Sequence, residues 1–293
     1  MPAPGTAHFP RVTHPGGTPG ARTCTNESPQ AEPSIFAMSN RSRMSLAALL
    51  VIAGIATLIV VVRDGMTDWR TASRAPVGLA PDPARTPEAV VQVYAARAVT
   101  WRGYFGVHSW VAVKPARAHA YTVYEVIGWR LRYSDSALAI RQRGADERWF
   151  GSEPELLADK RGPGVDRLIE RIDAAARAYP YAAEYGVWPG PNSNTFTAWI
   201  ARAVPELEVD LPPTAIGKDY LRDRWIATAP SGRGIQVSLY GLLGITASAI
   251  EGMEINLLGL TFGFHPYPPA IKLPLVGRVG AARHAGSRIG GDT

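Results

Sequence analysis

The chain has 293 residues, 46% of them hydrophobic, and its 31 Lys and Arg residues against 25 Asp and Glu residues give a formal charge of +6. This length and composition allow one sizeable core. Much of the positive charge lies in Arg-rich ends, and the basic residues of the middle are mixed with Asp and Glu, so nucleic acid is not an expected partner. The only cysteine is Cys24, near the N-terminus, which excludes intramolecular disulfides, Cys-ligated zinc and thiol catalysis in the core.

Residues 1–44 form a leader rich in Pro, Gly, Thr and Ser, with no apolar period. Such a segment cannot bury enough surface to offset the entropy of ordering it, so we expect it to be disordered. A start at Met38 would place a short basic leader directly before the following apolar run. The residues before Met38 therefore have the character of an over-extended gene start.

Residues 45–62 form an uncharged, mostly apolar run that is just long enough to cross a hydrocarbon core of ~30 Å at ~1.5 Å per residue. We expect a transmembrane helix; a buried globular helix and a cleaved signal peptide are the alternatives. No small-residue cleavage site follows Val62, which favours an uncleaved signal anchor. Arginines lie on both sides of the run, and we expect an inner-membrane, single-pass protein with a cytoplasmic N-terminus and a periplasmic main domain.

Residues 63–86 have the Pro-, Ala- and Arg-rich composition of a linker, so we expect a folded domain over residues 87–280 and a flexible tail over 281–293. The segment Pro87–Tyr94 fits either a helix capped by Thr86 or a strand favoured by its Val residues. Short β-branched or aromatic segments follow and predict consecutive antiparallel strands at 106–113, 121–126, 129–133 and 137–141.

Two helices are predicted next. Apolar residues recur at steps of three and four over residues 164–178, and again over 192–203. Pro180 and Pro205 end these helices. Beyond residue 213 the chain is Gly-punctuated and alternates apolar and polar residues, which predicts strands within 235–243, 253–263 and 266–280. The predicted fold class is α+β, an antiparallel sheet packed against a few helices and preceded by one transmembrane helix.

The strongest candidate for chemistry is the sequence Asn192-Ser193-Asn194 at the start of the second helix. A helix N-terminus stabilises negative charge, and a hydroxyl there with His108 folded against it would supply the nucleophile and base of a hydrolase. The alternative is a helix cap without chemistry, because Asn and Ser are preferred at that position. His108 has its own alternative as a half-buried strand residue bonded to the backbone.

Several segments resemble a bacterial family known only as a domain of unknown function (3750), over about residues 68–280. The resemblance implies a family and no activity. The segments that carry it are VVQVYAARA, VHSWVAVKPA, YPYAAEYGVWPGPNSNTF, DLPPTAIGKDYL, VSLYGLLG and EINLLGL.

A strand-borne His followed later by Asn-Ser-Asn-Thr-Phe at a helix start is also similar to the permuted NlpC/P60 and lecithin-retinol-acyltransferase-like thiol hydrolases, in which a Cys occupies the Ser position. This resemblance implies His108 as the base, Glu125 as its orienting residue and Ser193 in the place of the nucleophile. A hydroxyl is far more basic than a thiol, so Ser193 needs His108 as a true general base and an oxyanion hole from the N–H groups of Ser193 and Asn194.

Five further residues are candidates for substrate binding. Lys218 and Asp219 form a polar pair between apolar segments, where the alternative is a turn fixed by local hydrogen bonds. For Glu125, the alternative to orienting His108 is that its side chain faces solvent or pairs with Arg130 or Arg132. The substrate-binding candidates are Asn192, Asn194, Trp110, Lys218 and Asp219.

The sequence has no P-loop, dinucleotide fingerprint, GxSxG elbow or His spacing suited to a metal, so no cofactor and no metal are expected. The predicted function is a membrane-anchored envelope protein that binds the bilayer through residues 45–62 and carries a hydrolase-like domain acting on an amide or ester of an unknown envelope ligand. One alternative is a non-catalytic relative that binds a peptide, glycan or lipid fragment. Another is a structural envelope protein whose C-terminal half packs on a partner or on the membrane surface.

Overall fold

The computed structural model describes residues 69–281 and 286–288, together with several helical positions between residues 42 and 55. The chain divides into two compact units, residues 1–53 and residues 54–293, and the second unit contains the fold. Within the described residues, no helix has the length and apolar character needed to cross a membrane. Apart from the helical positions just named, the predicted leader, the start at Met38 and the predicted anchor at 45–62 lie outside the described residues.

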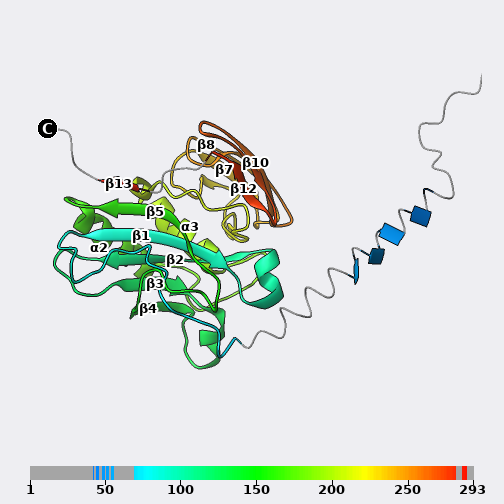
Figure 1. The fold of residues 1–293 in the computed structure, drawn as a ribbon. Coiled ribbons are helices and arrows are strands. Elements are labelled where there is room, and N and C mark those ends of the chain that lie inside the picture. The colour runs from blue at the N-terminus through cyan, green and yellow to red at the C-terminus, as the bar shows by residue number, and fades with distance from the viewer. Residues whose placement is uncertain are drawn as a thin grey trace, which may run out of the picture. The chain divides into compact units, whose positions relative to one another are not determined.

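The first sheet has six strands in the order β13-β5-β1-β2-β3-β4 (Figure 1). Strands β1 to β5 pair antiparallel, and β13 pairs in parallel with β5. A strand therefore lies at 286–288, inside the segment predicted to be a flexible tail. The sequence predicted β2, β3 and β4; it left the β1 segment open between helix and strand, and it did not predict β5. The strands are β1 (Val90–Arg97), β2 (Val107–Lys114), β3 (Thr122–Val126), β4 (Leu138–Gln142), β5 (Glu155–Arg161) and β13 (Gly286–Arg288).

One strand predicted from the sequence is wrong. Residues 129–133 lie almost entirely in a 3-10 helix, η2 (Gly128–Arg132). A Cβ at Gly128 would lie 2.4 Å from the ring of Tyr185, so the chain turns there in close contact with that ring. Aromatic and branched residues alone favoured a strand, but the turn at Gly128 decides the local structure. A second 3-10 helix, η1 (Thr100–Tyr104), joins β1 to β2.

Helices α2 (Val165–Arg177) and α3 (Ser193–Ala203) cover one face of the first sheet. The apolar period predicted both, and the buried side of α2 includes Leu168, Ile169 and Ile172, as expected. These side chains and Phe196 of α3 share a core with alternate residues of β1 and β2. The short helix η3 (Pro205–Leu207) follows α3.

The opposite face of the first sheet is also buried. Trp110 and Tyr94 lie in a second apolar core there. The backbone N–H groups of Leu79 and Ala80 donate to the Asp146 carboxylate at 2.6 and 3.2 Å. Residues 73–81, predicted to belong to a linker, therefore pack against the domain and are part of its fold.

The second sheet has seven strands in the order β12-β11-β10-β9-β8-β7-β6, each paired antiparallel with its neighbour in sequence. The predicted segments 235–243 and 253–263 each contain a tight turn, at Tyr240-Gly241 and at Leu258-Gly259, where φ is positive. The strands are β6 (Ile226–Thr228), β7 (Ile235–Leu239), β8 (Leu243–Ser248), β9 (Gly252–Leu257), β10 (Leu260–Pro266), β11 (Pro269–Leu273) and β12 (Gly277–Gly280).

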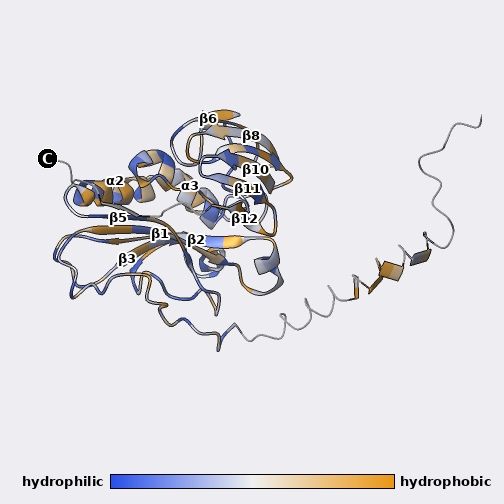
Figure 2. Cartoon of the chain, turned by 45° about the horizontal axis from the view of Figure 1, so that its top comes forward, coloured by the Kyte–Doolittle hydropathy of each residue, from blue (hydrophilic) through white to orange (hydrophobic). Residues whose placement is uncertain are grey.

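This second sheet has polar residues on its buried face and apolar residues on its exposed face, and the alternation of hydropathy along its strands is coloured in Figure 2. A sheet with one solvated face ordinarily has the opposite arrangement. We name the two surfaces the inner polar face and the outer apolar face. The inner polar face comprises Gln236, Ser238, Thr246, Glu254, Asn256, Thr261, His265 and Lys272; the outer apolar face comprises Ile226, Ile235, Val237, Leu239, Leu243, Ile245, Met253, Ile255, Leu257, Phe262, Phe264, Ile271, Leu273 and Val279.

Candidate functional site

The start of α3 is a complete helix cap. The Oδ1 atom of Asn192 accepts hydrogen bonds from the N–H groups of Asn194 at 2.9 Å and Thr195 at 3.2 Å. In return, the Asn192 N–H donates to the Thr195 hydroxyl at 3.1 Å, which completes a capping box. The Asn192 amide also donates to the carbonyl of Ile216 at 3.0 Å. The polar groups of Asn192 therefore hold the helix and the 216–217 turn in place.

Asn194 fastens α3 to strand β2. Its amide donates to the carbonyls of Val107 at 3.0 Å and Ile216 at 2.9 Å, and its Oδ1 accepts from the Ser109 hydroxyl at 2.9 Å. The Ser109 hydroxyl also lies 2.8 Å from the Thr197 hydroxyl. These groups are buried, so each needs the partners that it has. Of the neighbouring β2 residues His108 and Ser109, it is therefore Ser109 that faces α3.

His108 lies on the other face of the first sheet. Side chains of successive strand residues point to opposite faces, and Ser109 points to α3. The His108 ring accordingly stacks on Trp149, with 3.6 Å between ring centroids and 13° between planes, and its Nε2 lies 3.0 Å from the Glu125 carboxylate. The structure brings His108 and Glu125 together, as expected, but it separates both from Ser193 by the thickness of the sheet.

The His108–Glu125 pair belongs to a buried charge cluster. Arg141 and Arg143 both donate to the Glu125 carboxylate, at 2.9 and 3.3 Å. Burial by itself raises the pKa of Glu125, but the interaction with His108, the charge of Arg143 and the hydrogen bond from Arg141 outweigh it and hold that pKa well below its usual range. Burial lowers the pKa of His108. A neutral His108 that donates from Nε2 to an ionised Glu125 fits both shifts.

Aromatic rings enclose His108. Trp110 lies on the same face, 5.8 Å from His108 between ring centroids, and Trp129 stacks on Trp149 at 5.8 Å. The Trp110 indole donates to the carbonyl of Ala145 at 2.8 Å and is fully buried. Trp110, a candidate for substrate binding, is thus a core residue beside His108.

Lys218 and Asp219 lie in a different place, against the inner polar face of the second sheet. Lys218 pairs with Glu254, which also pairs with Lys272 at 2.6 Å. Asp219 accepts from the Asn256 amide at 2.8 Å. Burial alone would lower the pKa of Lys218, but Asp219 and Glu254 outweigh it and raise that pKa. These two candidates fix the second sheet to the segment that precedes it and do not meet Ser193 or His108 in a common cleft.

Sequence reasoning missed two surface features. The outer apolar face was visible as alternation in the segment GIQVSLYGLLG, but the alternation does not say which side is buried. A pocket of about 560 Å³ lies beside Arg97, Phe150 and Leu275; these residues come from separate segments, so spacing could not have found it. Among the described residues, no group of three or more His, Cys, Asp or Glu side chains is placed to hold a metal ion.

In the comparison with known proteins, a family model matches part of the chain. No curated protein and no solved structure is significantly similar to this chain. The segment matched by the family model begins just before β1, ends at Tyr220, and so includes β1 to β5, α2 and α3 but none of the second sheet. Residues 88–220 match the family model described as "Protein of unknown function (DUF3750)", so this part of the chain is similar to that uncharacterised family.

Proposed function

We propose that this protein is a non-catalytic, membrane-attached envelope protein whose second sheet rests with its outer apolar face on the acyl chains of a lipid bilayer. The observation that carries the proposal is the inverted sheet: branched and aromatic side chains point outward along all seven strands while charged and amide side chains point inward. Exposed apolar residues scattered singly need no explanation, but a continuous patch of this kind marks a contact with a partner or a membrane.

The outer apolar face is continuous because cross-strand neighbours are apolar in register. Val237 pairs with Ile245, Ile245 with Ile255, and Ile255 with Phe262. Ile245 and Ile255 are 54% and 59% exposed. With ~4.8 Å between strands and ~3.4 Å per residue, seven strands of about five residues cover roughly 500 Å², and burying that area at ~25 cal/mol per Å² would contribute up to roughly 12 kcal/mol.

A bilayer fits this surface better than a protein partner does. Protein interfaces combine an apolar centre with hydrogen-bonding groups, whereas the residues of the outer apolar face are all apolar, and the exposed Thr228 lies at its margin on the edge strand β6. Trp225, Tyr240 and Tyr267 are exposed at strand ends, where interfacial aromatic residues bind headgroups. Arg224 is exposed beside Trp225 and suits an anionic lipid. The apolar run at 45–62, predicted as an anchor, would keep the domain at a bilayer.

The placement of Ser193 supports the non-catalytic function over the hydrolase. A Ser nucleophile needs a base within hydrogen-bond reach. Ser193 begins the helix on one face of the first sheet, and His108 stacks on Trp149 on the other. On this proposal, the similarity of these segments to the permuted thiol hydrolases extends to the order of His, strand and helix, and not to a reaction.

The test uses the full chain in vesicles of phosphatidylcholine and phosphatidylglycerol. A Cys24→Ser background allows an environment-sensitive fluorophore to be placed at Ile255→Cys on the outer apolar face. The matched control carries the same fluorophore at Asp135→Cys, an exposed position in the bend between η2 and β4. We expect blue-shifted emission and quenching by lipid-borne quenchers at position 255 only.

Two results would overturn the proposal. The first is emission typical of water at both labelled positions in the presence of vesicles. The second is burial of position 255 that grows with protein concentration in lipid-free detergent and is unchanged by vesicles, since this pattern would assign the face to a second copy of the chain.

A further inference from the structure

We propose that the pocket beside Arg97 binds a small organic anion, with a carboxylate or phosphate group on the guanidinium and an apolar portion against Phe150 and Leu275. This inference is independent of membrane docking, because it concerns a different surface. The pocket has a volume of about 560 Å³, within the range of ligand sites in proteins. Its lining residues are Arg97, Ala98, Val99, Thr100, Gly103, Tyr104, Phe150, Gly151, Ser152 and Leu275.

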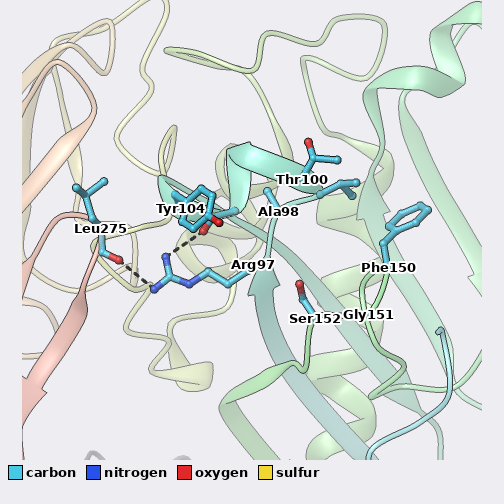
Figure 3. A pocket seen from close by; sticks show the side chains of 10 residues that line it. Arg97, Ala98, Thr100, Tyr104, Phe150, Gly151, Ser152 and Leu275 are labelled. Atoms are coloured by element: carbon cyan, nitrogen blue, oxygen red, sulfur yellow. Dashed lines mark hydrogen bonds between the residues drawn. The ribbon is translucent and has the colours of Figure 1, made fainter. Parts of the chain in front are cut away.

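The Arg97 guanidinium is held in a fixed orientation. It donates to the carbonyl of Gly103 at 3.2 Å and to the carbonyl of Leu275 at 3.0 Å. Figure 3 shows the side chain extended between Leu275 and the η1 turn, with Thr100, Phe150 and Ser152 around the space beside it. A guanidinium has five N–H donors in a planar fork, and the two bonds to carbonyls leave donors for a ligand.

The charge of Arg97 has no carboxylate partner in the part of the chain that the structure describes. Both of its hydrogen bonds go to neutral carbonyls, and none of the ion pairs between residues 69 and 281 includes it. Arg97 acts on Glu155 only at longer range, and burial and Asp210 still raise the pKa of Glu155. A guanidinium without a carboxylate in a pocket that also carries hydroxyl groups is the arrangement that recognises an oxyanion.

The backbone of the pocket is held in unusual conformations. Thr100, Phe150 and Leu275 all line it, and all have positive φ, at 59°, 49° and 67°. Positive φ is uncommon for any residue other than glycine and rarer still for a β-branched residue such as Thr100. Such conformations persist where the surrounding structure enforces them, and they cluster at ligand-binding sites.

The apolar lining of the pocket indicates a ligand that carries an alkyl or aryl group beside its anionic group. Phe150 packs edge-on against Trp149, with 5.0 Å between centroids, and Arg74 lies 4.1 Å from its ring centroid, so the ring is firmly placed. With Val99 and Leu275 it offers a surface for a short alkyl or aryl group. An inorganic ion would use only the Arg97 and hydroxyl side of the pocket, whereas hexanoate or phenyl phosphate would use both.

The experiment measures ligand binding by saturation-transfer difference NMR with the full chain in phosphatidylcholine nanodiscs, and empty nanodiscs supply the background. The probes are hexanoate, phenyl phosphate and, as a neutral analogue of hexanoate, hexanol. We expect saturation transfer to both anions, competition between them and weaker binding of hexanol. Inorganic phosphate should displace both if the oxyanion is the shared group.

Variants distinguish binding in the pocket from attraction of the anions by the positive charge of the whole protein. Arg97→Gln should weaken both anions by roughly tenfold or more, since it removes charge-assisted hydrogen bonds, and Arg97→Lys should give an intermediate loss. Arg102→Gln removes the same charge outside the pocket and should leave binding unchanged. Ser152→Leu fills the pocket without touching the guanidinium and should also abolish binding. Circular dichroism and thermal unfolding check the fold of each variant.

Clear results would overturn the inference. One is the absence of saturation transfer from either anion up to about 10 mM, the weak limit of specific binding. Another is hexanol binding as strongly as hexanoate. A third is equal loss in Arg97→Gln and Arg102→Gln, because general electrostatics would then explain the binding.

Discussion

The two sheets of this protein use opposite arrangements of polar and apolar residues. Both faces of the first sheet are buried under apolar residues, and its buried polar groups at Ser109 and Glu125 are fixed by helix and charge contacts. The second sheet buries a network of ions and amides and exposes aliphatic side chains. The packing of the first sheet therefore leaves neither of its faces in water, whereas the second sheet exposes an apolar face that is suited to contact with a membrane or another apolar surface.

The ion network of the second sheet gives the largest expected loss of stability. Glu254→Gln removes the carboxylate between Lys218 and Lys272, which leaves two buried ammonium groups without their shared partner. Breaking a buried pair from one side costs about 3–5 kcal/mol. The free energy of unfolding in urea measures this loss. Glu153→Gln is the control, because its pair with Arg148 is largely exposed and such pairs contribute about 0–1 kcal/mol.

A similar loss for the control and for Glu254→Gln would contradict the buried network. A double change of Lys218 and Glu254 to apolar residues of similar volume sharpens the comparison, since it removes both charges together. That variant should be more stable than Glu254→Gln alone.

Apolar truncations distinguish the two sheets directly. Ile172→Ala creates a cavity beneath the first sheet and should reduce the free energy of unfolding by about 2–5 kcal/mol. Ile255→Ala on the outer apolar face should change it by less than about 0.5 kcal/mol in lipid-free conditions. The same Ile255 variant should weaken contact with vesicles, measured by lipid quenching. Equal losses of stability at both positions without lipid would show that the outer face is already covered.

The sequence predicted the elements of the first sheet better than it predicted the face on which each side chain lies. The helical period located α2 and α3, and short branched segments located β2, β3 and β4. In GVHSWVAV, however, residues of both parities are buried, so no hydrophilic side marks the direction of His108 or Ser109. The hydrogen bonds of Ser109 with α3 show that Ser109 faces the helix and that His108 faces the opposite side of the sheet.

For the second sheet, the sequence predicts which side chains share a face but not which face is buried. Its strict alternation shows which residues share a face, but the rule that apolar residues point inward assigns the wrong face to the interior. The buried positions are occupied by charged and amide groups whose partners, such as Asp210 and Lys218, come from another part of the chain. Local sequence does not contain those pairings, so only the folded structure separates the inner polar face from the outer apolar face.

The charge cluster of the first sheet predicts loss of stability in acid. Burial holds the folded-state pKa of His108 below the ordinary value of about 6.5, so the unfolded chain takes up a proton first as the pH falls below about 6.5. Glu125, whose folded pKa is also lowered, adds stability above its unfolded pKa of 4.5 that is lost as the pH falls through the folded value. Both effects favour unfolding in acid. His108→Gln should flatten the fall between pH 6.5 and 5 in urea unfolding, and an unchanged profile would contradict the buried neutral imidazole.

The smallest expected effects concern the start of α3. A helix cap depends on the side chain of Asn192, whereas a catalytic nucleophile would be the side chain of Ser193. Asn192→Ala removes the acceptor of two helix N–H groups and should cost about 1–2 kcal/mol in urea unfolding. Ser193→Ala should cost less than about 0.5 kcal/mol, because the Ser193 contact with Ser109 uses its backbone carbonyl, which alanine retains. A larger loss at Ser193 than at Asn192 would mean that the Ser193 hydroxyl has a structural partner of its own. The expected order, with Asn192 far more sensitive than Ser193, is that of a helix cap and not of a catalytic serine.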